Sequence, residues 1–75
     1  MNPRLPALRP RKVLKALRKA GFYEDHRTGS HVILYKEGHP NPVSVPWHSK
    51  ALKRGTLFRI IKDAGLTPEE FLKLL

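Results

Sequence analysis

The chain has 75 residues and no cysteine, so we expect one small domain that neither disulfides nor a thiolate zinc site stabilises. It carries 15 lysine and arginine residues against 6 aspartate and glutamate residues, a net charge of +9. This excess favours a polyanionic partner and also attracts an acidic protein, and charge alone does not choose among RNA, DNA, a membrane surface and such a protein. No apolar run approaches the roughly 18 residues that span a bilayer, and the N-terminal residues contain no h-region of a signal peptide, so a cytoplasmic protein without a membrane partner is expected.

Residues 1–9 contain two prolines and two arginines with few apolar side chains, which predicts a flexible basic arm. The folded domain is expected over residues 10–75. Pro10 suits the first position of a helix that continues to Ala20, with Val13, Leu14 and Leu17 on one apolar stripe and Gly21 at its end. The other side of this helix is basic, and we expect it to be solvated or to contact an RNA backbone; it includes Arg11, Lys12 and Lys15.

Two extended segments follow and predict a β-hairpin. Residues 22–27 and 30–36 are rich in aromatic and β-branched side chains, and Thr28-Gly29 between them is typical of a turn. Alternation places His31, Ile33 and Tyr35 on one face of the second strand and Val32 and Leu34 on the other. Because both faces contain apolar residues, alternation does not identify the face that packs inward.

A third short strand is predicted at residues 43–45, ended by Pro46, and a helix at residues 55–64, ended by Gly65. The residues 67–70 form a capping box that begins a short final helix. The order predicts an α+β domain in which a three-stranded antiparallel sheet packs on helices. This αβββα arrangement, with a short C-terminal helix added, is that of the double-stranded-RNA-binding fold.

His31 opens the second strand at the rim of the predicted sheet, where solvent and ligands reach it. Histidine titrates near neutral pH, so a rigidly held and accessible copy is a candidate proton-transfer group. From the residues alone, an ordinary packed or solvated strand residue is favoured over a catalytic one.

A series of short motifs resembles the HicA toxins of bacterial toxin-antitoxin pairs over residues 11–71. These motifs are Gly21-Phe22, Gly29-Ser30-His31, Val45-Pro46-Trp47-His48, Gly55-Thr56-Leu57 and Gly65-Leu66. The resemblance implies a small endoribonuclease that cleaves mRNA, uses the histidine of the Gly-Ser-His triplet, here His31, and is neutralised by a HicB-type antitoxin. It implies no role for residues 1–9.

The chemistry of RNA fits these residues without a metal or another cofactor. The 2′-hydroxyl is an internal nucleophile, so the reaction needs only a general acid or base, here His31, and nearby cations that stabilise the phosphorane. The expected products carry 2′,3′-cyclic phosphate and 5′-hydroxyl ends. Gly29 and Ser30 are expected to aim His31 and to let the backbone approach a phosphate. Three further cations are candidates for phosphate or antitoxin contacts, with a solvated basic loop as the alternative: Lys50, Lys53 and Arg54.

The remaining histidines are expected to have other roles. His48 is expected to be structural or to contact RNA, with a second proton carrier as the alternative, and His26 and His39 are expected at the surface. A zinc site of Asp25, His26 and His31 lacks the paired ligand spacing of known sites. Trp47 and Tyr35 stack on bases if they are exposed, but burial is the expected use of a lone tryptophan.

Two other classes of function remain open at this stage. The first is a double-stranded-RNA-binding module without activity, in which His31 is an ordinary strand residue. The second is an interaction protein, for instance a DNA-binding regulator, whose basic surface only docks a partner. No helix-turn-helix or zinc-finger spacing supports the second class.

Overall fold

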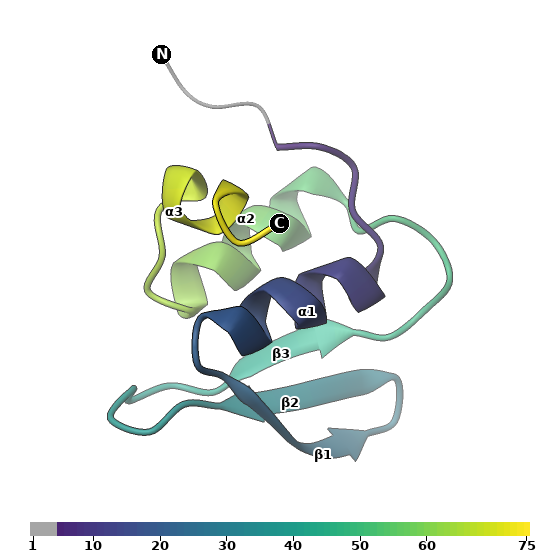
Figure 1. Cartoon of the computed structure of the whole chain (residues 1–75). Helices are drawn as coiled ribbons and strands as arrows, with labels where there is room; N and C mark the ends of the chain where they lie inside the picture. The colour runs from purple at the N-terminus through teal and green to yellow at the C-terminus, as the bar shows by residue number, and fades with distance from the viewer. Residues whose placement is uncertain (1–4) are drawn as a thin grey trace.

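A computed structural model describes residues 5–75 and shows a helix, three strands and two further helices along the chain (Figure 1). The elements are α1 (Pro10–Lys19), β1 (Tyr23–Thr28), β2 (His31–Tyr35), β3 (Val43–Pro46), α2 (Arg54–Asp63) and α3 (Pro68–Leu72). This order confirms the predicted α+β fold of the αβββα type with a short C-terminal helix. Each of the first five elements begins and ends within one residue of its predicted bounds.

The three strands form one antiparallel sheet with β2 in the centre. Val32 and Leu34 of β2 lie beside Val45 and Val43 of β3, and all four side chains are buried. The inward face of β2 is therefore the one that carries Val32 and Leu34. Figure 1 shows α1 across this face, and α2 packs against β3, the edge strand. His31 and the alternate residues of β2 consequently lie on the other face.

The core is formed by one side of each helix and the inner face of β2 and β3. The apolar stripe predicted for α1 is buried, as is the stripe of α2, because both follow the helical period. The largest fully buried side chains of the helices are Val13, Leu14, Leu17, Leu57, Ile61 and Phe71. In contrast, all six residues of β1 are exposed, so β1 extends the sheet without contributing to the core.

Helix α1 ends at a Schellman motif. The N–H of Phe22 donates to the carbonyl oxygen of Leu17 over 3.0 Å, and the N–H of Gly21 donates to that of Arg18 over 3.0 Å. Gly21 has a φ of 101°, which is accessible to glycine at low cost. The buried side chains of Phe22 and Leu17 provide the apolar contact typical of this motif. The chain thereby turns sharply from α1 into the sheet.

The predicted capping box at the start of α3 is confirmed. The N–H of Glu70 donates to the Thr67 hydroxyl over 3.1 Å, and the N–H of Thr67 donates to the Glu70 carboxylate over 2.8 Å. The pKa of the Glu70 carboxyl is lowered from its usual value, mainly because the Thr67 backbone N–H donates a hydrogen bond to the carboxylate. This cap begins the helix that places Phe71 in the core.

Residues 5–9 of the expected flexible arm pack against the domain. Leu5 and Leu8 are buried in the core, and the carbonyl oxygen of Leu8 accepts a hydrogen bond from the N–H of Leu52 over 2.7 Å. These two leucines could not form a core by themselves. They are buried because the loop before α2 and the core of the domain supply an apolar surface for them. Residues 1–4 of the expected arm lie outside the described residues.

Candidate active site

His31 stands at the turn end of the β1–β2 hairpin. It pairs with Thr28 of β1 and with Pro46 of β3, so its backbone is held on both sides. The tight turn before it uses Gly29 at a φ of 55°, a left-handed conformation that suits glycine. The His31 side chain is exposed, and within residues 5–75 no hydrogen bond or ion pair occupies its ring. Both ring nitrogens are therefore accessible to a ligand.

An open cleft of about 340 Å³ lies between the end of the sheet and α2. The sheet contributes His31, Ser44 and Pro46, and α2 contributes Thr56, Arg59, Ile60 and Asp63. The α2 residues share one side of the helix because positions three, four and seven apart coincide on a helical face. The volume falls within the range of small-molecule sites, so the cleft has room for part of a nucleotide.

Arg59 is the cation of the cleft. Its Nε atom lies 3.9 Å from the Asp63 carboxylate one turn along α2, and its side chain is 84% exposed. An ion pair this long and this exposed is weak, so it tethers Arg59 loosely. The guanidinium remains able to bind a phosphate oxygen in competition with Asp63. The cleft thus combines an imidazole with a guanidinium and the hydroxyls of Ser44 and Thr56.

The predicted RNA-binding residues fall into separate groups. Gly29 and Ser30 form the turn beside His31, whereas Lys12 and Lys15 are exposed on α1 and do not line the cleft. A second hollow of about 380 Å³ adjoins the cleft, and its lining consists of Pro46, His48, Lys50, Ala51, Leu52, Lys53 and Thr56. Arg11 and Arg54 are in neither hollow: Arg11 lies near Trp47, and Arg54 lies beside Leu5.

Four polar residues of the cleft were not predicted from the sequence as site residues, namely Ser44, Thr56, Arg59 and Asp63. A signal for three of them was present. Thr56, Arg59 and Asp63 form a polar line at helical spacing beside the apolar stripe of α2. Nothing in the sequence indicated that this line faces His31, because that depends on how α2 packs against β3.

The other histidines are engaged elsewhere. His26 donates to the Asp25 carboxylate over 2.7 Å at the exposed strand β1, as expected for a surface residue. His39 is half-buried, which differs from the expectation: its Nε2 donates to the carbonyl oxygen of Asp63 over 2.7 Å, and its ring packs edge-on against Phe22. His48 accepts a hydrogen bond from the Lys50 N–H over 3.2 Å and lies outside the His31 cleft.

No cluster of three histidine, cysteine, aspartate or glutamate side chains among residues 5–75 is arranged to bind a metal ion. Asp25, His26 and His31, which were considered as zinc ligands, accordingly do not form such a cluster. Within the same residues, no helix has the length and apolarity needed to cross a bilayer.

The fold and the cleft define a small basic αβββα domain with an accessible histidine at the end of its sheet. The family model described as the HicA toxin of bacterial toxin-antitoxin systems matches residues 10–66. The match covers most of the chain, which therefore belongs to the HicA toxin family. A search of curated proteins gave no match. Proteins of this family are the toxins of toxin-antitoxin pairs and generally act as mRNA interferases.

Proposed function

We propose that this HicA toxin is a metal-independent endoribonuclease that cleaves mRNA with His31 as general acid or base. The observation that supports this proposal is the placement of the accessible His31 ring in one cleft with the Arg59 guanidinium. An imidazole moves protons near neutral pH, and a guanidinium neutralises charge on phosphate oxygens. These are the two tasks that cleavage of RNA by its own 2′-hydroxyl requires.

In the proposed reaction, the 2′-oxygen forms a bond to phosphorus as the bond from phosphorus to the 5′-oxygen breaks. In one arrangement His31 removes the 2′ proton and water protonates the departing 5′-oxygen; in the other, water takes the 2′ proton and protonated His31 delivers a proton to the 5′-oxygen. Arg59 stabilises the negative charge that develops on the non-bridging oxygens. The products are a 2′,3′-cyclic phosphate and a 5′-hydroxyl. Hydroxyls of Ser44 and Thr56 are available to position the phosphate.

We further propose that a HicB-type antitoxin neutralises the protein by covering the His31 cleft and that it presents acidic side chains there. The net charge of +9 supports this partner chemistry, because opposite charge speeds encounter and aligns the two surfaces.

The test of the catalytic proposal compares wild type with His31→Ala on a defined single-stranded RNA in EDTA. His26→Ala is the matched control, because His26 is an exposed strand histidine outside the cleft. We expect cleavage by wild type and by His26→Ala, and a loss of about a hundredfold or more in His31→Ala, the usual worth of general acid-base catalysis. Replacing an exposed side chain changes stability by only about 0.5 kcal/mol, so His31→Ala should remain folded.

The products and the role of metal provide further checks. Products with 3′-hydroxyl and 5′-phosphate ends, or loss of wild-type cleavage in EDTA, would refute the proposed mechanism. If wild type and His31→Ala bind RNA equally and neither cleaves it, the chain is a non-catalytic RNA-binding module, the alternative that the fold itself suggests.

A further inference from the structure

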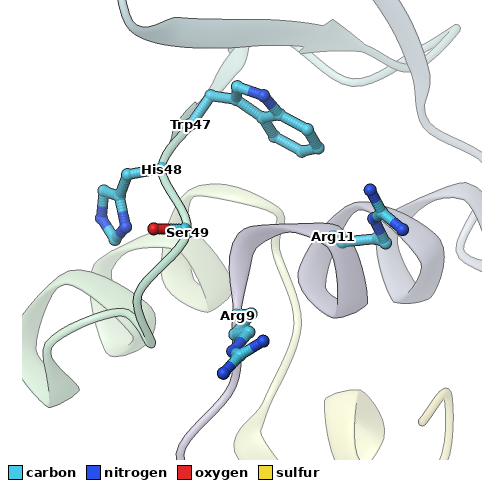
Figure 2. Close-up of a pocket in the computed structure, with 5 residues that line it drawn as sticks. All are labelled: Arg9, Arg11, Trp47, His48 and Ser49. Carbon is cyan, nitrogen blue, oxygen red and sulfur yellow. The ribbon is translucent and has the colours of Figure 1, made fainter.

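A third hollow, of about 460 Å³, lies around Trp47 (Figure 2). Its lining combines Trp47, His48 and Ser49, which follow β3, with Arg9 and Arg11 at the start of α1. In Figure 2 the Arg11 guanidinium extends toward the Trp47 indole. Trp47 is half-buried, so part of its ring packs on the core while part borders open space. The expected burial of this lone tryptophan is thus incomplete.

The hollow is strongly basic. Arg27 of β1 lies with its guanidinium carbon 4.8 Å from the centroid of the Trp47 ring, a cation–π contact, but Arg27 does not line the hollow. Among residues 5–75, no carboxylate pairs with Arg9, Arg11 or Arg27. Their charges are uncompensated and available to an anion.

This hollow adjoins the hollow around Lys50 and Lys53, which in turn adjoins the His31 cleft. The cleft and the middle hollow share Pro46 and Thr56, and the middle hollow and the Trp47 hollow share His48. Cations recur along the whole path, whereas Asp63 is the sole acidic residue that lines any of the three. The path follows the loop between β3 and α2 and matches the needs of a phosphate backbone.

We infer that the Trp47 hollow is a nucleotide subsite for single-stranded RNA, in which an unpaired base stacks on the indole and Arg9 and Arg11 bind the neighbouring phosphates. The inference rests on the proposed ribonuclease function. It adds that the substrate is single-stranded and long enough to extend from His31 to Trp47. An indole stacks on a base only when the base is unpaired, because in a duplex both faces of a base are covered. The cleaved bond lies at His31, so only an RNA that also extends through the middle hollow reaches Trp47.

Trp47 is the only tryptophan, so emission excited at the red edge of the absorption band, where the two tyrosines absorb little, reports on the surroundings of Trp47. The probe is a single-stranded RNA of about ten nucleotides, a length within the usual site sizes of single-strand binders. It is titrated into His31→Ala, which binds without cleaving under the proposed function. We expect saturable quenching of the Trp47 emission, and no such quenching with a blunt RNA duplex of the same length.

The double variant Arg9→Gln and Arg11→Gln tests the subsite while leaving Trp47 in place. Its control is Lys62→Gln with Lys73→Gln, which removes the same charge from exposed positions outside the three hollows. In the otherwise wild-type protein we expect the arginine variant to raise KM for the long RNA about tenfold with kcat little changed, and the lysine variant to raise it far less. Trp47→Leu should act in the same direction, with thermal unfolding measured to show that it remains folded.

The outcomes separate this inference from the proposed function. If RNA is bound and cleaved, yet the Trp47 emission does not change and the arginine variant equals the lysine control, the subsite is wrong and the ribonuclease proposal stands. If RNA quenches Trp47 in a saturable way but wild type does not cleave it, the subsite stands and the ribonuclease proposal fails. If wild type neither binds nor cleaves RNA, both are wrong.

Discussion

The backbone N–H of Trp47 donates a hydrogen bond to the carbonyl oxygen of Ser30 across an N···O distance of 2.6 Å. This bond continues the pairing of β2 and β3 one step past the facing residues His31 and Pro46. The turn that precedes His31 and the loop that carries Trp47 are therefore joined through the backbone. Groups proposed for proton transfer and for base stacking thus share one piece of the sheet, and an RNA bound as proposed would be held in a defined position relative to both.

Replacement of Arg59 by glutamine is expected to lower kcat by about a hundredfold, because removal of one charge-stabilising donor from a transition state has that effect in other enzymes. The measurement is single-turnover cleavage of a short RNA. Lys62→Gln is the matched control, since Lys62 is another exposed cation of α2 and does not line the cleft. An equal loss in the two variants would mean that Arg59 contributes only to the general positive field.

Gly29→Ala is expected to destabilise the protein by about 1 kcal/mol, the usual cost of a left-handed conformation for a residue with a Cβ atom. The φ of Gly29 is 55°, and a Cβ built there meets no atom within 4 Å, so strain is the sole cause. Asparagine tolerates this conformation better, so Gly29→Asn should cost less than Gly29→Ala. Urea unfolding measures both. Equal stability of Gly29→Ala and wild type would show that the turn relaxes to another conformation.

Leu8→Ala is expected to lower the free energy of unfolding by about 2 kcal/mol or more, the cost of removing a buried leucine side chain. The Leu8 side chain is 8% exposed and belongs to the core. Ala7→Ser, at the exposed neighbouring position, is the control and should change stability by no more than about 0.5 kcal/mol. A flexible arm over residues 5–9 would instead make the two variants equivalent in urea unfolding.

Association with the HicB-type antitoxin is expected to weaken as salt concentration rises, because the proposed contact joins a basic surface to an acidic one. Calorimetric titration at two or more sodium chloride concentrations gives the dependence. The loss should appear mainly as slower association, since long-range steering is the part that salt screens most. An affinity that does not change with salt would contradict an acidic antitoxin surface at the His31 cleft.

The sequence by itself determined the elements and their ends, because these depend on neighbours along the chain. Pro10, Gly21 and the Thr67–Glu70 capping box act within one or two helical turns, and the turn at Gly29 acts within the hairpin. The position of His31 at the start of a strand was predictable for the same reason. Together with the family motifs, these local signals were enough to predict the fold and to single out the histidine.

Tertiary structure alone decided which surfaces meet. Both faces of β2 carry apolar residues, so the burial of Val32 and Leu34 and the exposure of His31 follow from the packing of α1 and β3 rather than from alternation. Packing of α2 on the edge strand brings Arg59 to the cleft of His31, and the core covers Leu5 and Leu8. Periodicity places residues on a side of their own element, but the free energy of burial depends on the partner surface, which lies far away in the sequence.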